Sequence, residues 1–386
     1  MSVHKQNVEA ASASSSRGPL NGTRVIELAG LGPVPFCAML LADMGGEILC
    51  IAPPLPNTTL PCSAPRDLLL RGRTRLTLDL KQSQSRAALL AAMAHADVLL
   101  EGFRPGVLER LGLGPQECLA ANPRLVIGRM TGWGQSGPLA AAPGHDSNYL
   151  ALTGALHAIG YAGQSPCPPL NLVADLGGGA LYLGLGVLAA LLHVRSGGRG
   201  QVVDAAMVDG AASLMTMIYE LYGRGLWSDE RGRNLLDGGA PFGATYETAD
   251  GKYVAVCALE PHFYSALLAA LGLDERTLPP QHERASWPVL RERLAAAFKT
   301  RTRDEWARLL ERSDACVTPV LSLAEAPEHP HNRARQVFVG DSAKIPAAAP
   351  RFSHTPTAHA PAVGPPASQL LARWGVAAAT VAALTQ

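Results

Sequence analysis

The chain has 386 residues, enough for two or three domains of ordinary size. Its 33 Lys and Arg residues nearly balance 32 Asp and Glu residues, so the net charge of +1 provides no global field to attract nucleic acid or an anionic membrane. Only 17% of the residues are charged and 47% are hydrophobic, which predicts a large core with apolar surface left for a subunit interface.

Targeting and disulfide signals are missing from the sequence. The seven cysteines are scattered and form no C-x-x-C pair, which argues against a zinc ribbon or a secreted disulfide framework. The first 18 residues contain no apolar segment of a secretory signal, and they predict a disordered tail. No stretch reaches 18 uninterrupted apolar residues, so we expect no membrane span. These features predict a cytoplasmic protein.

The first half alternates apolar strands with helices. This alternation is typical of a parallel sheet covered by helices, and it predicts a large α/β domain over residues 19–205. The expected strands are 24–28, 47–51, 75–80, 97–100 and 125–130, and the expected helices are 36–44, 83–95 and 180–194.

The second half has a different pattern. Asp250-Gly251 is a strong turn signal between two short β-rich runs, 245–248 and 251–259, and predicts a hairpin. Helices are expected at 262–271, 287–299 and 303–312. We therefore predict a smaller α+β domain. The expected boundaries are a linker at 206–238, the small domain at 239–328, a second linker at 329–350, and a return segment to the large domain at 351–386, helical at 369–385 with a break near Gly375.

The loop Gly30–Pro35 follows a strand and precedes a helix, where a dinucleotide fingerprint would lie. Its third glycine is replaced by Pro35, and no acidic residue ends the second strand. The pattern favours an ordinary strand-to-helix turn over a site for NAD.

Three acid-base residues stand beside turns or element ends. His145 and Asp146 form a Gly-His-Asp turn, which suits either a base held near neutrality or a helix cap. Asp175 precedes three glycines and a long apolar helix, as an N-cap or as a group beside an open backbone that a ligand can approach. Glu260 ends an apolar strand. The residues alone leave these alternatives open.

Two further clusters point to ligand chemistry. His329 and His331 have the spacing of metal ligands but lack a third ligand nearby, so we expect a solvated loop and no metal. Arg71, Arg73 and Arg75 form a compact basic cluster beside a strand. It is too short for nucleic acid but suits one phosphorylated small ligand.

Nine sequence blocks together resemble the family III CoA transferases of the CaiB/BaiF type, and are closer still to one branch, the α-methylacyl-CoA racemases. The resemblance extends from about Pro19 to Ser353. The blocks are residues 19–30, 79–81, 101–107, 131–138, 144–149, 169–172, 237–241, 260–264 and 314–320.

The resemblance implies a Rossmann-like large domain built from both chain ends, a small domain, and an interlocked homodimer whose site lies between one subunit's large domain and the other's small domain. It also implies inversion of the α-carbon of a 2-methylacyl-CoA thioester. Such 1,1-proton transfer needs two acid-base groups on opposite faces of one carbon. His145, oriented by Glu260, would serve one face, and Asp175, with a pKa raised by burial, the other.

The enolate formed between these bases needs hydrogen-bond donors, and we expect one from the backbone N–H near Asp146 at a helix start. No metal or organic cofactor is expected, because CoA is part of the substrate. The residues expected to bind CoA or the acyl group are Arg71, Arg73, Arg75, Leu78, Lys81, Gly102, Phe103, Arg104, Arg110, Gly144 and Tyr149.

Two other functions remain open at this point. In the transferases of the family the Asp at the Asp175 position is a nucleophile, which makes a CoA transferase the first alternative. The second is an isomerase or binding protein with this fold that acts on a non-CoA molecule. Its support is that the position expected to hold a CoA-phosphate arginine is Pro53, while another usual arginine is Thr74. Loss of one charge-assisted phosphate contact weakens binding roughly tenfold to a hundredfold.

Overall fold

The computed structural model describes residues 18–54, 68–341, 343–357 and 359–385. The predicted tail therefore lies outside the described residues except for Gly18, as does Cys62. The chain divides into two compact units. The first contains the residues up to Leu150, Leu170–Ser213 and the residues from Ala347 onward, and the second contains Ala151–Pro169 and Leu214–Pro346.

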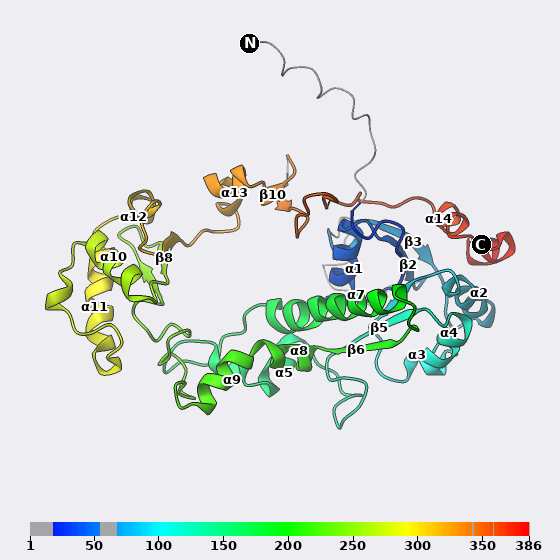
Figure 1. The fold of residues 1–386 in the computed structure, drawn as a ribbon, viewed down its shortest axis with the longest axis horizontal. Helices are drawn as coiled ribbons and strands as arrows, with labels where there is room; N and C mark the ends of the chain where they lie inside the picture. The colour runs from blue at the N-terminus through cyan, green and yellow to red at the C-terminus, as the bar shows by residue number, and fades with distance from the viewer. Residues whose placement is uncertain (1–17, 55–67, 342, 358, 386) are drawn as a thin grey trace, which may run out of the picture. The chain divides into compact units, whose positions relative to one another are not determined.

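The first unit is built on a six-stranded parallel sheet (Figure 1). The strand order is β3-β2-β1-β4-β5-β6. The strands are β1 (Arg24–Leu28), β2 (Glu47–Ala52), β3 (Arg73–Thr77), β4 (Val98–Glu101), β5 (Val126–Thr131) and β6 (Val202–Ala206). The α/β prediction and its five strands are confirmed, although β3 begins two residues earlier than expected. The edge strand β6 was not predicted.

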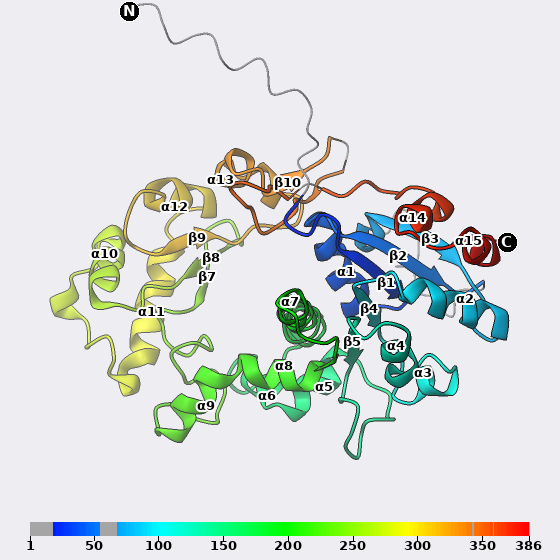
Figure 2. The same ribbon diagram turned by 45° about the vertical axis from the view of Figure 1, so that its right-hand side comes forward.

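Helices cover both faces of this sheet, as Figure 2 shows. On one face lie α1 (Pro33–Asp43) and α7 (Tyr182–Arg195), and on the other lie α2 (Ser83–Met93), α4 (Pro115–Ala121), α14 (Ala367–Arg373) and α15 (Ala378–Thr385). The strands are buried on both sides, which explains why they read as continuous apolar runs. The predicted helical ending broken near Gly375 is confirmed by α14 and α15.

The carboxyl-terminal segment reaches the edge strand β3 before these last helices. The Gly72 N–H donates to the Pro361 carbonyl over 2.7 Å, and the Gly364 N–H donates to the Arg73 carbonyl over 2.8 Å. The return of the chain end to the large α/β unit therefore rests on backbone hydrogen bonds at the exposed side of β3.

The second unit contains a three-stranded antiparallel sheet, β7-β8-β9, covered by helices. The predicted hairpin is confirmed by β7 (Thr245–Glu247) and β8 (Tyr253–Val256), with β9 (Val317–Pro319) added beside it. Aromatic rings fill its core, among them Phe242, Tyr246 and Phe298. The helices of this unit are α6 (Ala155–Ala158), α9 (Thr216–Gly223), α10 (Pro261–Leu271), α11 (Trp287–Phe298), α12 (Arg303–Leu310) and α13 (Pro330–Ala334); a further short pair is β10 (Phe338–Val339) with β11 (Ile345–Pro346).

One continuous helical stretch among the described residues, Leu172–Arg195, is long and apolar enough to cross a membrane by length and composition, with a mean hydropathy of 1.7. It comprises a π-helical segment of ten residues, Leu172–Leu181, which we call the π-helical turn, followed by α7. Leu183 and Val187 of α7 are fully buried and lie against Gly128 of β5. This contact makes α7 a covering helix of the sheet.

Candidate active site

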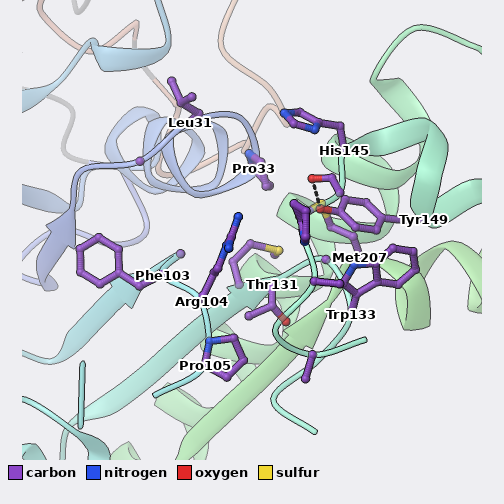
Figure 3. Close-up of a pocket in the computed structure, with 18 of the residues that line it drawn as sticks. Leu31, Pro33, Phe103, Arg104, Pro105, Thr131, Trp133, His145, Tyr149 and Met207 are labelled. Carbon is purple, nitrogen blue, oxygen red and sulfur yellow. Dashed lines mark hydrogen bonds between the residues drawn. The ribbon is translucent and has the colours of Figure 1, made fainter. Parts of the chain in front are cut away.

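The sheet order reverses direction between β1 and β4, and the chain leaves these two neighbouring strands toward opposite faces. In open parallel sheets such a switch point opens a crevice beyond the carboxyl ends of the strands. A pocket of about 240 Å³ lies there in the first unit (Figure 3). Its lining comes from the segments that follow β1, β4, β5 and β6, namely Gly30–Val34 without Gly32, Gly102–Pro105, Met130–Trp133 and Met207, together with Ala140 and residues 142–145 and 149.

Six of the predicted site residues line this pocket. They are Gly102, Phe103, Arg104, Gly144, His145 and Tyr149. In Figure 3 the Arg104 side chain extends into the pocket from the end of β4, and His145 lies at its rim. Apolar residues that also line the pocket, among them Leu31, Val34, Trp133 and Met207, were not predicted as site residues. Apolar side chains carry no chemical signature in a sequence, although Trp133 belongs to one of the recognised blocks.

Asp175 lies within the π-helical turn Leu172–Leu181, which leads directly into α7. Of the two alternatives for Asp175, the N-cap is excluded, because the helix already begins at Leu172. A π-helical turn is uncommon and is frequent at functional sites. Gly32, before α1, lies against the Asp175 carboxylate: a Cβ at Gly32 would come within 3.4 Å of Asp175 Oδ2.

Partial burial raises the pKa of Asp175 above its ordinary value. Desolvation is the largest cause, and the negative charge of Asp146 adds to it. Two groups act in the opposite direction: a hydrogen bond of 3.4 Å from the Asn171 amide, and the positive charge of His145. Asp175 is therefore a half-buried carboxyl group that lies close enough to His145 and Asp146 for their charges to affect its pKa.

His145 and Asp146 stand at the start of α5 (Asp146–Leu152). The His145 ring is exposed, while its backbone is fixed by a bond from its N–H to Asn148 Oδ1 and by its carbonyl, which accepts the Asn148 N–H. Asp146 is the first residue of the helix, so its N–H has no carbonyl partner within α5. Its side chain, by contrast, is buried and accepts the backbone N–H groups of Ala174 and Asp175, each over 2.9 Å.

The Tyr149 ring is wedged into the loop that carries His145. Its hydroxyl donates to the Gly144 carbonyl, and its ring meets Trp133 edge-on with centroids 4.8 Å apart. A Cβ at Gly144 would meet the ring at 2.7 Å, and one at Gly132 would overlap it. Burial raises the pKa of Tyr149, and the Asp175 charge adds to the effect. Tyr149 therefore shapes the loop as well as lining the pocket.

The three arginines of the basic cluster have different surroundings. Arg71 pairs with buried Asp43, and the fully buried Arg73 pairs with Glu27 over 2.8 Å. These two guanidinium groups make structural ion pairs in place of the predicted phosphate contacts, because neither faces the solvent. Arg75 alone of the three is exposed.

The other predicted binding residues lie outside the pocket. Leu78 is buried, and its side chain packs in the hydrophobic core of the first unit. Lys81 is exposed at the turn after β3, and Arg110 is exposed at the end of α3 (Val107–Arg110). Pro53, at the expected CoA-phosphate position, is exposed after β2.

A buried carboxylate, that of Glu101, binds the loop that carries Gly102–Arg104. Glu101 Oε2 accepts the Phe103 N–H over 2.7 Å, and Glu101 Oε1 pairs with Arg129 over 2.7 Å. Burial raises the pKa of Glu101 despite these contacts. Arg129 also pairs with Glu109 at 2.8 Å, which ties the loop to α3.

Glu260 belongs to the second unit. It stands at the N-cap position of α10, its side chain is exposed, and it makes no side-chain cap bond. The expected pairing with His145 stays a prediction. Within the part of the chain that the structure describes, no three His, Cys, Asp or Glu side chains form a group able to hold a metal ion.

Several known proteins are similar to this chain in sequence or in fold. The family model described as CoA-transferase family III matches residues 20–369. The α-methylacyl-CoA racemase of Mus musculus is 46% identical over 362 residues, covering 92% of this chain and 93% of that protein. The Homo sapiens protein of the same name is 44% identical over 339 residues, covering 87% of each. The crystal structure of a CaiB/BaiF family protein from Brucella suis matches with a TM-score of 0.78 at 24% identity, over 93% of this chain and all of that one. The chain therefore belongs to CoA-transferase family III.

Proposed function

We propose that this protein is an isomerase that inverts the α-carbon of 2-methylacyl-CoA thioesters by proton transfer. The observation that carries this proposal is that Asp175 lies close enough to His145 for the positive charge of His145 to lower the pKa of Asp175, against the raising effect of burial. The similarity to two α-methylacyl-CoA racemases over most of the chain supports the same reaction.

The reaction needs one group that removes the α-proton and a second that returns a proton to the opposite face. An ordinary Asp is too acidic to donate efficiently near neutral pH, so the raised pKa of Asp175 brings its acidity closer to that of an imidazole. In one direction Asp175 accepts the proton and the His145 imidazolium donates one. In the other direction their roles are exchanged, and the protein returns to a state with one proton on the pair.

Proton removal leaves an enolate whose negative charge develops at the thioester oxygen. The Asp146 N–H is free of a helical partner and lies at the positive end of α5, and we assign it as a donor to that oxygen. Glu260 would orient His145 through its carboxylate. No metal or organic cofactor takes part in this scheme.

CoA recognition would use the basic residues that remain exposed. Arg104 extends into the pocket, and Arg75, Lys81 and Arg110 are exposed on the same unit. Gly102 and Phe103 contribute backbone and an apolar surface for the pantetheine arm. With Pro53 at the position of an expected arginine, the diphosphate would rely on these side chains.

The alternative of a CoA transferase differs at Asp175. A transferase would need its carboxylate as a nucleophile and would form an acyl-enzyme that hydroxylamine traps. A racemase forms no such intermediate. The presence of His145 beside Asp175 favours proton transfer, because a nucleophilic carboxylate needs no imidazole partner.

We also propose a cytoplasmic homodimer. Leu181, Leu185 and Leu192 follow helical spacing, and each exposes half or more of its surface: 51%, 66% and 66%. An apolar face of this kind is typical of a protein interface. Light scattering with size-exclusion chromatography would report a mass of twice 40.4 kDa for the dimer.

Deuterium exchange tests the reaction. The protein is incubated in D2O with (2S)-2-methylacyl-CoA, and mass gain and diastereomer ratio are followed. We expect deuterium uptake with epimerisation, lost in His145→Ala and Asp175→Asn. Trapping of an acyl-enzyme by hydroxylamine would favour the transferase. The absence of exchange and of trapping would favour a molecule not carried by CoA.

A further inference from the structure

The Asp146 carboxylate has no role in the scheme above, which uses only its backbone N–H. Its side chain is nevertheless buried and hydrogen-bonded: Asp146 is 5% exposed, and its Oδ2 accepts the N–H groups of Ala174 and Asp175. These two donors belong to the π-helical turn, whereas Asp146 begins α5. The carboxylate therefore joins the two segments that carry the two proposed bases.

The other oxygen of this carboxylate is unusual. Asp146 Oδ1 is buried and has no hydrogen-bond partner among the described residues. Buried carboxylates normally satisfy both oxygens, because an unpaired buried acceptor costs about 1–3 kcal/mol. Among the described residues no donor binds that oxygen, and the negative charge of Asp146 raises the pKa of Asp175.

We propose that Asp146 is a positioning residue whose carboxylate fixes Asp175 in the π-helical turn and supplies the negative charge that lets Asp175 donate a proton as well as accept one. This inference rests on the proposed proton-transfer function. It assigns to the side chain a role separate from that of the Asp146 N–H.

Among the described residues, the other groups that interact with Asp175 come from the segments around it. His145 stands in the segment before α5, Tyr149 on α5, and Asn171 precedes the π-helical turn itself. On the side of α1, Gly32 brings no side chain. His145 and Asn171 favour the charged form of Asp175, and Asp146 disfavours it. Tyr149 is the neutral neighbour whose own pKa Asp175 raises.

Replacing Asp146 by Asn separates charge from hydrogen bonding. The amide oxygen still accepts both N–H groups, but the negative charge is gone. The pKa of Asp175 should then fall, because the neighbouring negative charge that helps to raise it is removed. Asn171→Leu removes a hydrogen bond to the charged form and should shift the pKa in the opposite direction.

The titration of Asp175 itself is the test. Substrate-free protein labelled with carboxyl-13C aspartate is titrated by NMR, and the Asp175 signal is assigned by its loss in Asp175→Asn. We expect the midpoint to fall in Asp146→Asn and to rise in Asn171→Leu. An unchanged midpoint in folded Asp146→Asn would overturn the proposal. Asp146→Ser, which also keeps an acceptor without charge, gives the same readout if the Asn variant fails to fold.

This measurement does not depend on turnover, so it is distinguishable from a failure of the proposed function. If the wild-type protein shows no deuterium exchange, the racemase function is refuted, but the titration of Asp175 can still be measured and compared between variants. In an active protein, the acid limb of kcat/KM should move to lower pH in Asp146→Asn by the same amount as the NMR midpoint. A uniform loss of activity with no movement of that limb would show a purely structural residue.

Discussion

Gly32 and Asp175 are 143 positions apart in the chain, yet a methyl group on Gly32 would come within 3.4 Å of Asp175 Oδ2. Gly32 also has φ of +66°, a conformation that side chains rarely adopt. The turn between β1 and α1 thus lies within contact distance of the Asp175 carboxylate, and its left-handed backbone at residue 32 favours glycine.

Gly32→Ala adds a methyl group in contact with Asp175 and strains the left-handed backbone of this turn. The turn should therefore shift against Asp175, and deuterium exchange should fall by about 10- to 100-fold, the effect of a small misplacement of a reacting group. The matched control is Gly22→Ala, at a similar φ of +79° with no atom within 4 Å of the added methyl. Both variants should lose comparable stability in a thermal melt, but only the Gly32 variant should lose exchange. Equal exchange in the two variants would contradict the close approach to Asp175.

Replacing Arg73 and replacing Arg75 should change the stability of the protein by very different amounts, although the two residues are only two positions apart on β3. Arg73→Met leaves Glu27 buried without its ion-pair partner, so the free energy of unfolding should fall by about 3–5 kcal/mol. Arg75→Met removes an exposed charge and should change stability by less than about 0.5 kcal/mol.

CoA affinity provides the second readout for this pair. If Arg75 contacts a phosphate, its replacement should raise the Kd for CoA about tenfold in isothermal titration calorimetry. A variant of Arg75 with unchanged Kd would remove it from the binding site. Denaturant unfolding of both variants checks the stability half of the prediction.

Tyr149→Phe keeps the ring between Gly132 and Gly144 but removes the hydrogen bond to the Gly144 carbonyl. Loss of about 1 kcal/mol from the loop that holds His145 should reduce kcat/KM about fivefold. Tyr219→Phe removes a similar tyrosine-to-carbonyl bond, to Thr153, away from the pocket. That control should retain full activity, and an equal loss in both variants would point to a general effect on folding.

The ionisation of Glu325 should make the stability of the protein depend on pH. Its hydrogen bonds with Arg303 hold the pKa of Glu325 well below its ordinary value, with further contributions from the Ser322 N–H and Lys252. A group whose pKa is depressed by folding stabilises the protein above the pKa of the unfolded chain, about 4.3, and loses that contribution as the pH falls below it.

The Tm of the wild-type protein should therefore exceed that of Glu325→Gln most at pH 6–7, and the difference should shrink as the pH is lowered through about 4. Glu328→Gln is the control, because Glu328 has one exposed ion pair of 3.6 Å with Arg333. A difference in Tm that is independent of pH would contradict the titration of Glu325.

The sequence by itself determined the α/β class, five of the six strands, the hairpin, the terminal helices and the family. Local apolar periodicity and turn residues are sufficient for elements, as with Asp250-Gly251 between β7 and β8. The edge strand β6 was missed because three of its five residues are not buried, so it lacks the continuous apolar run of a central strand.

Only the tertiary structure decided which charged residues are free to act. Arg73 and Arg75 look equivalent in the sequence and, two residues apart on β3, share one face of the sheet. The Arg73 side chain is covered and binds Glu27 and the Pro35 carbonyl, whereas Arg75 is exposed. The same holds for Asp146 and Asp175: their contact depends on α5 meeting a π-helical turn nearly thirty residues later. Burial and partner charges arise from segments distant along the chain, and it is these that determine the proton affinity and accessibility of a side chain.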